Sequence, residues 1–125
     1  MDINNIIKYK TGAEKDMTGR IAKGRFDLIS PIALERIAML YAKGAEKYED
    51  RNWEQGIPFS QCIDSLLRHA NQYRMGMRDE DHIAAVAWWA FAIMHFEFTN
   101  PYLDDLPYYT DEFDKRKHDK EIKDS

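Results

Sequence analysis

Apolar residues recur at three-to-four spacing after Ser30-Pro31, and this pattern predicts a helix over residues 31–48. Serine is a favoured N-cap and proline suits the first helical position, so the same dipeptide marks the start. Gly44 lies inside this helix, where it either permits a close neighbour or marks a kink.

Two more apolar stripes predict helices over residues 59–75 and 80–98. Gly76 marks the end of the helix predicted over residues 59–75. The acidic residues 79–81 suit the N-terminus of the second, which stops before Asn100-Pro101. The predicted fold is all-α, a small helical bundle with three main helices.

The last predicted helix is apolar nearly all round, so it has to be enclosed on most sides. Either the flanking segments cover it or a homo-oligomer completes the bundle. Residues 1–29 show no sustained period and predict an irregular arm. Residues 99–125 form a tail whose first half is apolar enough to dock and whose last ten residues we expect to be mobile.

The length of 125 residues suits a single domain, 1–125, with its helical core at 30–98. A net charge of −4 argues against a basic groove, so we expect no direct DNA binding. The only cysteine, Cys62, excludes an internal disulfide, and no signal sequence opens the chain, which indicates the cytoplasm. The longest apolar run, 83–98, is too short to cross a membrane.

Polar residues on the predicted helices are the candidates for chemistry. Asp64 and Arg68 are four residues apart on one helix face, and His69 lies about 100° further round. They form either a surface ion pair with a neighbouring histidine or an anion or metal site. His82 begins the apolar helix, where it is either a hydrogen-bonded structural group or, with His69, an acid, base or metal ligand.

Carboxylates that hold Mg²⁺ or Mn²⁺ beside lysine or arginine would suffice to cleave a phosphoanhydride on such a scaffold. The pattern does not choose among the candidate oxygen ligands, which are Asp27, Glu35, Glu46, Asp64, Asp79 and Asp81.

Several short motifs occur together along residues 11–98. They are Thr11-Gly12-Ala13, the run 24–29 (GRFDLI), 44–48 (GAEKY), 51–56 (RNWEQG), Arg68-His69 and 79–85 (DEDHIAA). In this combination the chain resembles the dATP/dGTP diphosphohydrolase N-terminal-domain family of phages and prophages, which is related to the MazG-type pyrophosphohydrolases.

The resemblance implies hydrolysis of a purine deoxynucleoside triphosphate to its monophosphate and pyrophosphate, with Mg²⁺ or Mn²⁺, in phage control of the nucleotide pool. Lys47 and Arg68 would contact phosphates, Trp53 would stack on a base, Asn52 would hydrogen-bond the substrate, and Arg25 would also bind it. The residues implied for metal or water are His69 and His82 with nearby carboxylates such as Asp64.

Two positions depart from the related patterns. MazG-type proteins carry a Glu-x-x-Glu helix followed by a Glu-x-x-Asp helix; here Glu46-x-x-Glu49 is present, but the next two predicted helices lack the second motif. The family often has asparagine where this chain has Trp89. Two rival hypotheses therefore stay open, a non-catalytic phage accessory protein that binds a partner through the aromatic tail, and a nucleotide-binding regulator.

Overall fold

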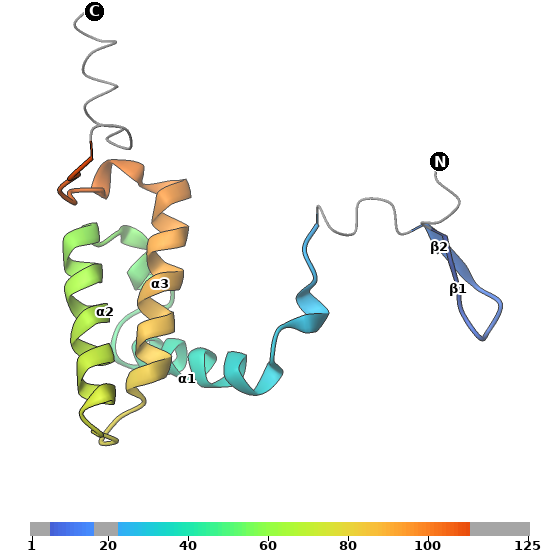
Figure 1. Ribbon diagram of the computed structural model, residues 1–125, viewed down its shortest axis with the longest axis horizontal. Helices are drawn as coiled ribbons and strands as arrows, with labels where there is room; N and C mark the ends of the chain where they lie inside the picture. The colour runs from blue at the N-terminus through green and yellow to red at the C-terminus, as the bar shows by residue number, and fades with distance from the viewer. Residues whose placement is uncertain (1–5, 17–22, 111–125) are drawn as a thin grey trace, which may run out of the picture. The chain divides into compact units, whose positions relative to one another are not determined.

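A computed structural model describes residues 6–16 and 23–110 (Figure 1). The chain divides into two compact units, residues 1–34 and 35–125. In the first unit β1 (Ile6–Lys8) and β2 (Glu14–Asp16) are followed by a 3₁₀ turn, η2 (Phe26–Leu28). The main helices are α1 (Pro31–Lys47), α2 (Phe59–Arg74) and α3 (His82–Thr99), and two further 3₁₀ turns are η3 (Asn52–Gln55) and η4 (Pro101–Leu103). The all-α fold predicted from the pattern is confirmed, with helix ends within two residues of those expected.

Side chains cap the starts of α1 and α3. The Ala33 amide donates to Ser30 Oγ over 3.2 Å at the start of α1, as the Ser30-Pro31 signal predicts. At the start of α3 the Ala84 amide donates to Asp81 Oδ1 over 3.3 Å. The acidic residues before α3 thus include its N-cap.

The arm contains a short hairpin that the sequence pattern did not predict. β1 and β2 pair antiparallel with Ile7 opposite Lys15, and the Tyr9 amide donates to the Ala13 carbonyl over 2.7 Å in the turn. Strands of three residues are too short to show an alternating pattern, which is why the region looked irregular. The mobility expected for the last ten residues concerns positions outside the described range.

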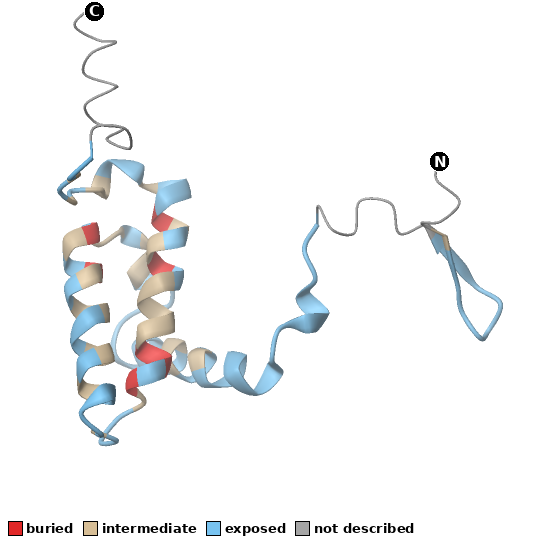
Figure 2. Ribbon diagram, in the orientation of Figure 1, coloured by how far each residue is buried: buried red, intermediate tan, exposed pale blue. Residues whose placement is uncertain are grey.

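The core lies between α2 and α3, which run antiparallel side by side (Figure 1). Its buried centre consists of Phe59, Cys62, Ala92 and Phe96, and Trp53, Trp88 and Leu103 are among the residues packed around it. The buried positions fall mainly along α3 (Figure 2). Burial raises the pKa of the Cys62 thiol, so this cysteine is a packing residue with little thiolate character.

The tail docks on this core, as its apolar first half predicted. Leu103 and Leu106 pack against the core cluster, and Asp105 accepts hydrogen bonds from the Ser60 amide at 2.8 Å and the Ser60 hydroxyl at 2.6 Å. Gly56 makes this docking possible, because it has φ +107° and a Cβ there would lie 2.6 Å from Leu103 Cδ1. The tail therefore holds the start of α2 and the loop before it.

One face of α3 stays uncovered within the described residues. Phe91, Met94 and Phe98 are spaced three and four residues apart, so they share a face, and they are 40%, 57% and 89% exposed. In the described part of the chain no helix is long and apolar enough to span a membrane.

Candidate functional site

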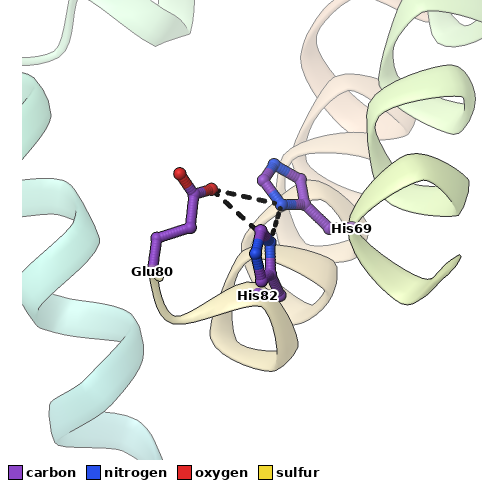
Figure 3. Close-up of side chains that lie close together, drawn as sticks. All are labelled: His69, Glu80 and His82. Atoms are coloured by element: carbon purple, nitrogen blue, oxygen red, sulfur yellow. Dashed lines mark hydrogen bonds and ion pairs between the residues drawn. The ribbon is translucent and has the colours of Figure 1, made fainter. Parts of the chain in front are cut away.

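Two histidines and a glutamate meet where α2 approaches the start of α3 (Figure 3). His69 Nδ1 lies 2.9 Å from His82 Nδ1. Glu80 Oε1 lies 3.4 Å from His69 Nδ1 and 3.6 Å from His82 Nδ1. His82 is only 2% exposed and His69 is half-buried, whereas Glu80 faces solvent. We call His69, Glu80 and His82 the histidine cluster.

Asp79 orients the buried histidine of this cluster. His82 Nε2 lies 2.8 Å from Asp79 Oδ1, and this hydrogen bond lowers the pKa of the Asp79 carboxyl below its usual value. An ionised carboxylate can only accept, so Nε2 carries the proton and donates it. In the neutral imidazole the lone pair of His82 is then on Nδ1, the atom that points at His69 and Glu80.

Asp81 ties α1 to the start of α3. Arg36 donates to it twice, from Nε to Oδ2 at 2.9 Å and from Nη2 to Oδ1 at 2.6 Å. The paired guanidinium is the main reason why the pKa of Asp81 is lowered, and Lys43 contributes to the same shift. Arg36 and Lys43, seven residues apart on α1, thus bring positive charge to Asp81, the residue before His82.

We expect Asp81→Asn to reduce stability in a pH-dependent way. Asparagine keeps the N-cap but loses the ion pair with Arg36. Because the folded-state pKa of Asp81 lies below its ordinary value of 3.8, its carboxylate stabilises the fold fully above about pH 5 and progressively less as the pH falls through that lowered pKa. Urea unfolding at a series of pH values should give a difference between wild type and variant that is constant from pH 7 to about pH 5 and shrinks below about pH 4. A difference independent of pH would show that the charge of Asp81 is not what stabilises this contact.

An aromatic cavity of about 710 Å³ opens between α1, η3 and α3. Tyr41, Trp53, Trp88 and Trp89 line it, together with Arg51 and Asn52. The ring centroid of Tyr41 lies 5.5 Å from that of Trp88 and 5.7 Å from that of Trp53. The ring centroids of Trp88 and Trp89 are 4.9 Å apart. Burial raises the pKa of the Tyr41 hydroxyl. Flat apolar rings with a few polar groups are suited to a heterocyclic base.

The cavity and the histidine cluster both include residues of α3. Trp89 follows His82 by seven residues on α3, two turns further along roughly the same face. At 1.5 Å per residue the two positions are about 10 Å apart along the helix axis. A ligand as long as a nucleotide could reach both.

The structure brings some predicted site residues together and leaves others apart. His69 and His82 meet in the cluster, whereas Asp64 pairs with Arg68 on an exposed face of α2. Asn52 and Trp53 both line the cavity, where the Asn52 side-chain oxygen accepts a hydrogen bond from Gln55.

Two other predicted substrate-binding residues have partners of their own. The Lys47 ammonium lies 5.4 Å from the centre of the Tyr48 ring. Arg25 binds Asp27 through two hydrogen bonds of 2.9 Å, both within the unit formed by residues 1–34.

Two of the predicted carboxylate ligands have partners of their own. Asp79 holds His82, Asp81 holds Arg36, and Glu35 and Glu46 are exposed on α1. Within the described residues the one group of three possible ligands, with all donor atoms within 4.8 Å, is the histidine cluster. Mg²⁺ prefers oxygen ligands in an octahedral arrangement, so two imidazole nitrogens and one carboxylate do not fit it.

Sequence reasoning missed three residues that the fold places at these sites. Glu80 was assigned to the helix start, although its spacing of two residues before His82 was a usable signal. Tyr41 was assigned to the core stripe of α1 but lines the cavity. Arg36 pairs with Asp81, which is 45 residues away in the sequence, so no local spacing could have predicted this ion pair.

These features define a small all-α protein in which α3 contributes to both an aromatic cavity and a histidine–carboxylate cluster. The sequence model of the family described as dATP/dGTP diphosphohydrolase, N-terminal, matches residues 13–106. The chain belongs to this family, as its motifs indicated, and the family name is that of a diphosphohydrolase. No curated protein and no solved structure matches the chain.

Proposed function

We propose that the protein hydrolyses a purine deoxynucleoside triphosphate, dATP or dGTP, to its monophosphate and pyrophosphate. Membership of a diphosphohydrolase family supports this reaction. The observation that carries it is that α3 contributes both to the aromatic cavity and to the histidine cluster. In this proposal the cavity holds the base and the cluster lies beside the phosphates.

The base would stack among Tyr41, Trp53 and Trp88, and Asn52 would supply a polar contact at the edge of the cavity. Trp89 lines the cavity at the position where the family often has asparagine, so this chain offers an additional ring and one amide fewer for the base. Stacking is sequence-tolerant, so the polar contacts would select the purine.

Hydrolysis would join a water oxygen to the α-phosphorus and break the bond between that phosphorus and the pyrophosphate oxygen. A group of the histidine cluster would take the proton of the water. Positive side chains would balance the charge of the phosphates. Arg68 and Lys47 are the candidates from the resemblance, and Arg36 and Lys43, which both act on the charge of Asp81, are further candidates. Mg²⁺ or Mn²⁺ would arrive bound to the triphosphate substrate, because Mg²⁺ is usually held by one or two carboxylates together with substrate phosphates.

The direct test is incubation of the purified protein with each deoxynucleoside and ribonucleoside triphosphate and Mg²⁺. Monophosphate and pyrophosphate should appear in equal amounts from dATP or dGTP, with no release of free phosphate. If well-folded protein turns over none of these substrates, the enzyme proposal fails.

Gly44 offers a test of the cavity that leaves the histidine cluster intact. It lines the cavity from α1, in helical conformation, and a Cβ there would have no atom within 4 Å. Gly44→Ala should therefore stabilise the fold by about 0.5–1 kcal/mol through helix propensity and retain activity. Gly44→Phe should fill part of the cavity and lower kcat/KM roughly tenfold or more, equivalent to about 1.4 kcal/mol.

Steady-state kinetics and thermal melts on Gly44→Ala and Gly44→Phe separate the effect on activity from the effect on stability, with Gly44→Ala as the matched control. Full activity in folded Gly44→Phe would place the base elsewhere.

A homo-oligomer is part of the same proposal. The exposed face formed by Phe91, Met94 and Phe98 on α3 supports it, because apolar side chains at this spacing are typical of a helix that packs against another. Light scattering on the purified protein should give a mass above that of one chain. A deoxynucleotide substrate would place the protein in the cytoplasm, that of the host if the chain is phage-encoded.

A further inference from the structure

The histidine cluster has the geometry of a site for a transition-metal ion. Four-coordinate Zn²⁺ binds imidazole nitrogen and carboxylate oxygen at about 2.0–2.2 Å, so tetrahedral ligand atoms lie roughly 3.3–3.6 Å apart. The three donor atoms of the cluster are separated by 2.9 Å, 3.4 Å and 3.6 Å. They form a triangle close to one face of such a tetrahedron.

The triangle is not accounted for by a hydrogen bond between the imidazoles alone. One proton shared between His69 Nδ1 and His82 Nδ1 would explain their 2.9 Å contact. It would not explain why Glu80 Oε1 stands almost equally far from both nitrogens. A cation bound among the three atoms would account for the position of Glu80 Oε1 beside both nitrogens, with the 2.9 Å nitrogen–nitrogen contact shorter than in an ideal tetrahedron.

The surroundings of His82 match those of a metal ligand. Asp79 accepts the proton of His82 Nε2 at 2.8 Å, which leaves the Nδ1 lone pair directed at the centre of the cluster. Such a carboxylate–histidine pair behind the ligand atom is the usual way in which proteins fix a metal-binding imidazole. His82 is buried, and the solvent-facing Glu80 leaves an entry path.

We propose that His69, Glu80 and His82 bind one first-row transition-metal ion of the Zn²⁺ class, with at least one coordination position left open to solvent. Imidazole ligands favour Zn²⁺ over Mg²⁺, so this ion is distinct from the one that accompanies a nucleotide. Three protein ligands with an open position are the arrangement of catalytic rather than structural zinc sites.

The test uses the full chain, stripped with a chelator, and Zn²⁺ or Co²⁺ alone. Competition against a chromophoric chelator should give one Zn²⁺ bound per chain, unaffected by millimolar Mg²⁺. Bound Co²⁺ should show the visible absorption of a four- or five-coordinate site. His69→Ala and Glu80→Gln should each weaken Zn²⁺ binding strongly, and Asp79→Asn should weaken it by about 10–100-fold through the orientation of His82.

Glu97→Gln, on an exposed position of α3, is the matched control and should bind Zn²⁺ like the wild type. Glu80 is exposed, so its variant keeps the test valid even if substitution of the buried His82 prevents folding. Folded protein that binds no stoichiometric Zn²⁺, or variants of His69 and Glu80 that bind it as tightly as wild type, would overturn the proposal. Because no nucleotide is present, this outcome is independent of whether the protein hydrolyses triphosphates.

Discussion

Phe96→Ala is expected to cost about 3–5 kcal/mol of folding free energy, the largest effect of any substitution considered. Phe96 is 0% exposed and belongs to the buried centre shared by α2 and α3. Its ring centroid lies 6.0 Å from that of Trp53, so the cavity left behind would also loosen a wall of the aromatic cavity. Domains have about 5–15 kcal/mol of stability in total, so much of the population should unfold near physiological temperature.

Chemical denaturation followed by circular dichroism measures this loss. Phe26→Ala removes the same ring from a position that is 80% exposed, and it should change the free energy of unfolding by less than about 0.5 kcal/mol. Equal effects of the two substitutions would mean that the centre of the fold is not where Phe96 lies.

His69→Ala is expected to lower kcat by at least about 100-fold if the proposed hydrolysis is correct. His69 Nδ1 contacts both His82 and Glu80, so its removal disables the cluster whether that cluster moves a proton directly or through a bound ion. The side chain is 21% exposed, so the variant should still fold. Rates of pyrophosphate release from dATP and dGTP, with a thermal melt of each sample, measure the effect.

Arg68→Ala, at the position next to His69 on α2, is the variant with which His69→Ala is compared. Its guanidinium pairs with Asp64 on the exposed face, so a role in phosphate binding should raise KM and leave most of kcat. Unchanged kcat in folded His69→Ala would remove the histidine cluster from the reaction.

The helices were predictable because their signals are local. Ser30-Pro31 and Asp81 act within one turn of the helices they start, and the apolar stripes reflect faces that pack. The hairpin was not predictable from the sequence, because Ile7 and Lys15 lie opposite each other in a backbone pairing that needs no side-chain pattern.

The candidate site was predictable only in part, because its contacts join residues that are far apart in the sequence. His69 and His82 stood out as polar groups on apolar helices, but their 2.9 Å contact depends on how α2 turns into α3. The Arg36–Asp81 pair and the contact between Tyr41 and Trp88 join α1 to α3 across more than 40 residues. Such long-range packing decides which of many carboxylates are occupied by ion pairs and which stay near the histidines.

The aromatic cavity gives the protein a built-in optical reporter. The chain has 3 tryptophans, and all of them, Trp53, Trp88 and Trp89, line this one cavity. Intrinsic emission excited at the indole band therefore comes almost entirely from its walls. Titration with an unlabelled nucleotide would register occupancy of the cavity directly as quenching, with no background from tryptophans elsewhere in the molecule.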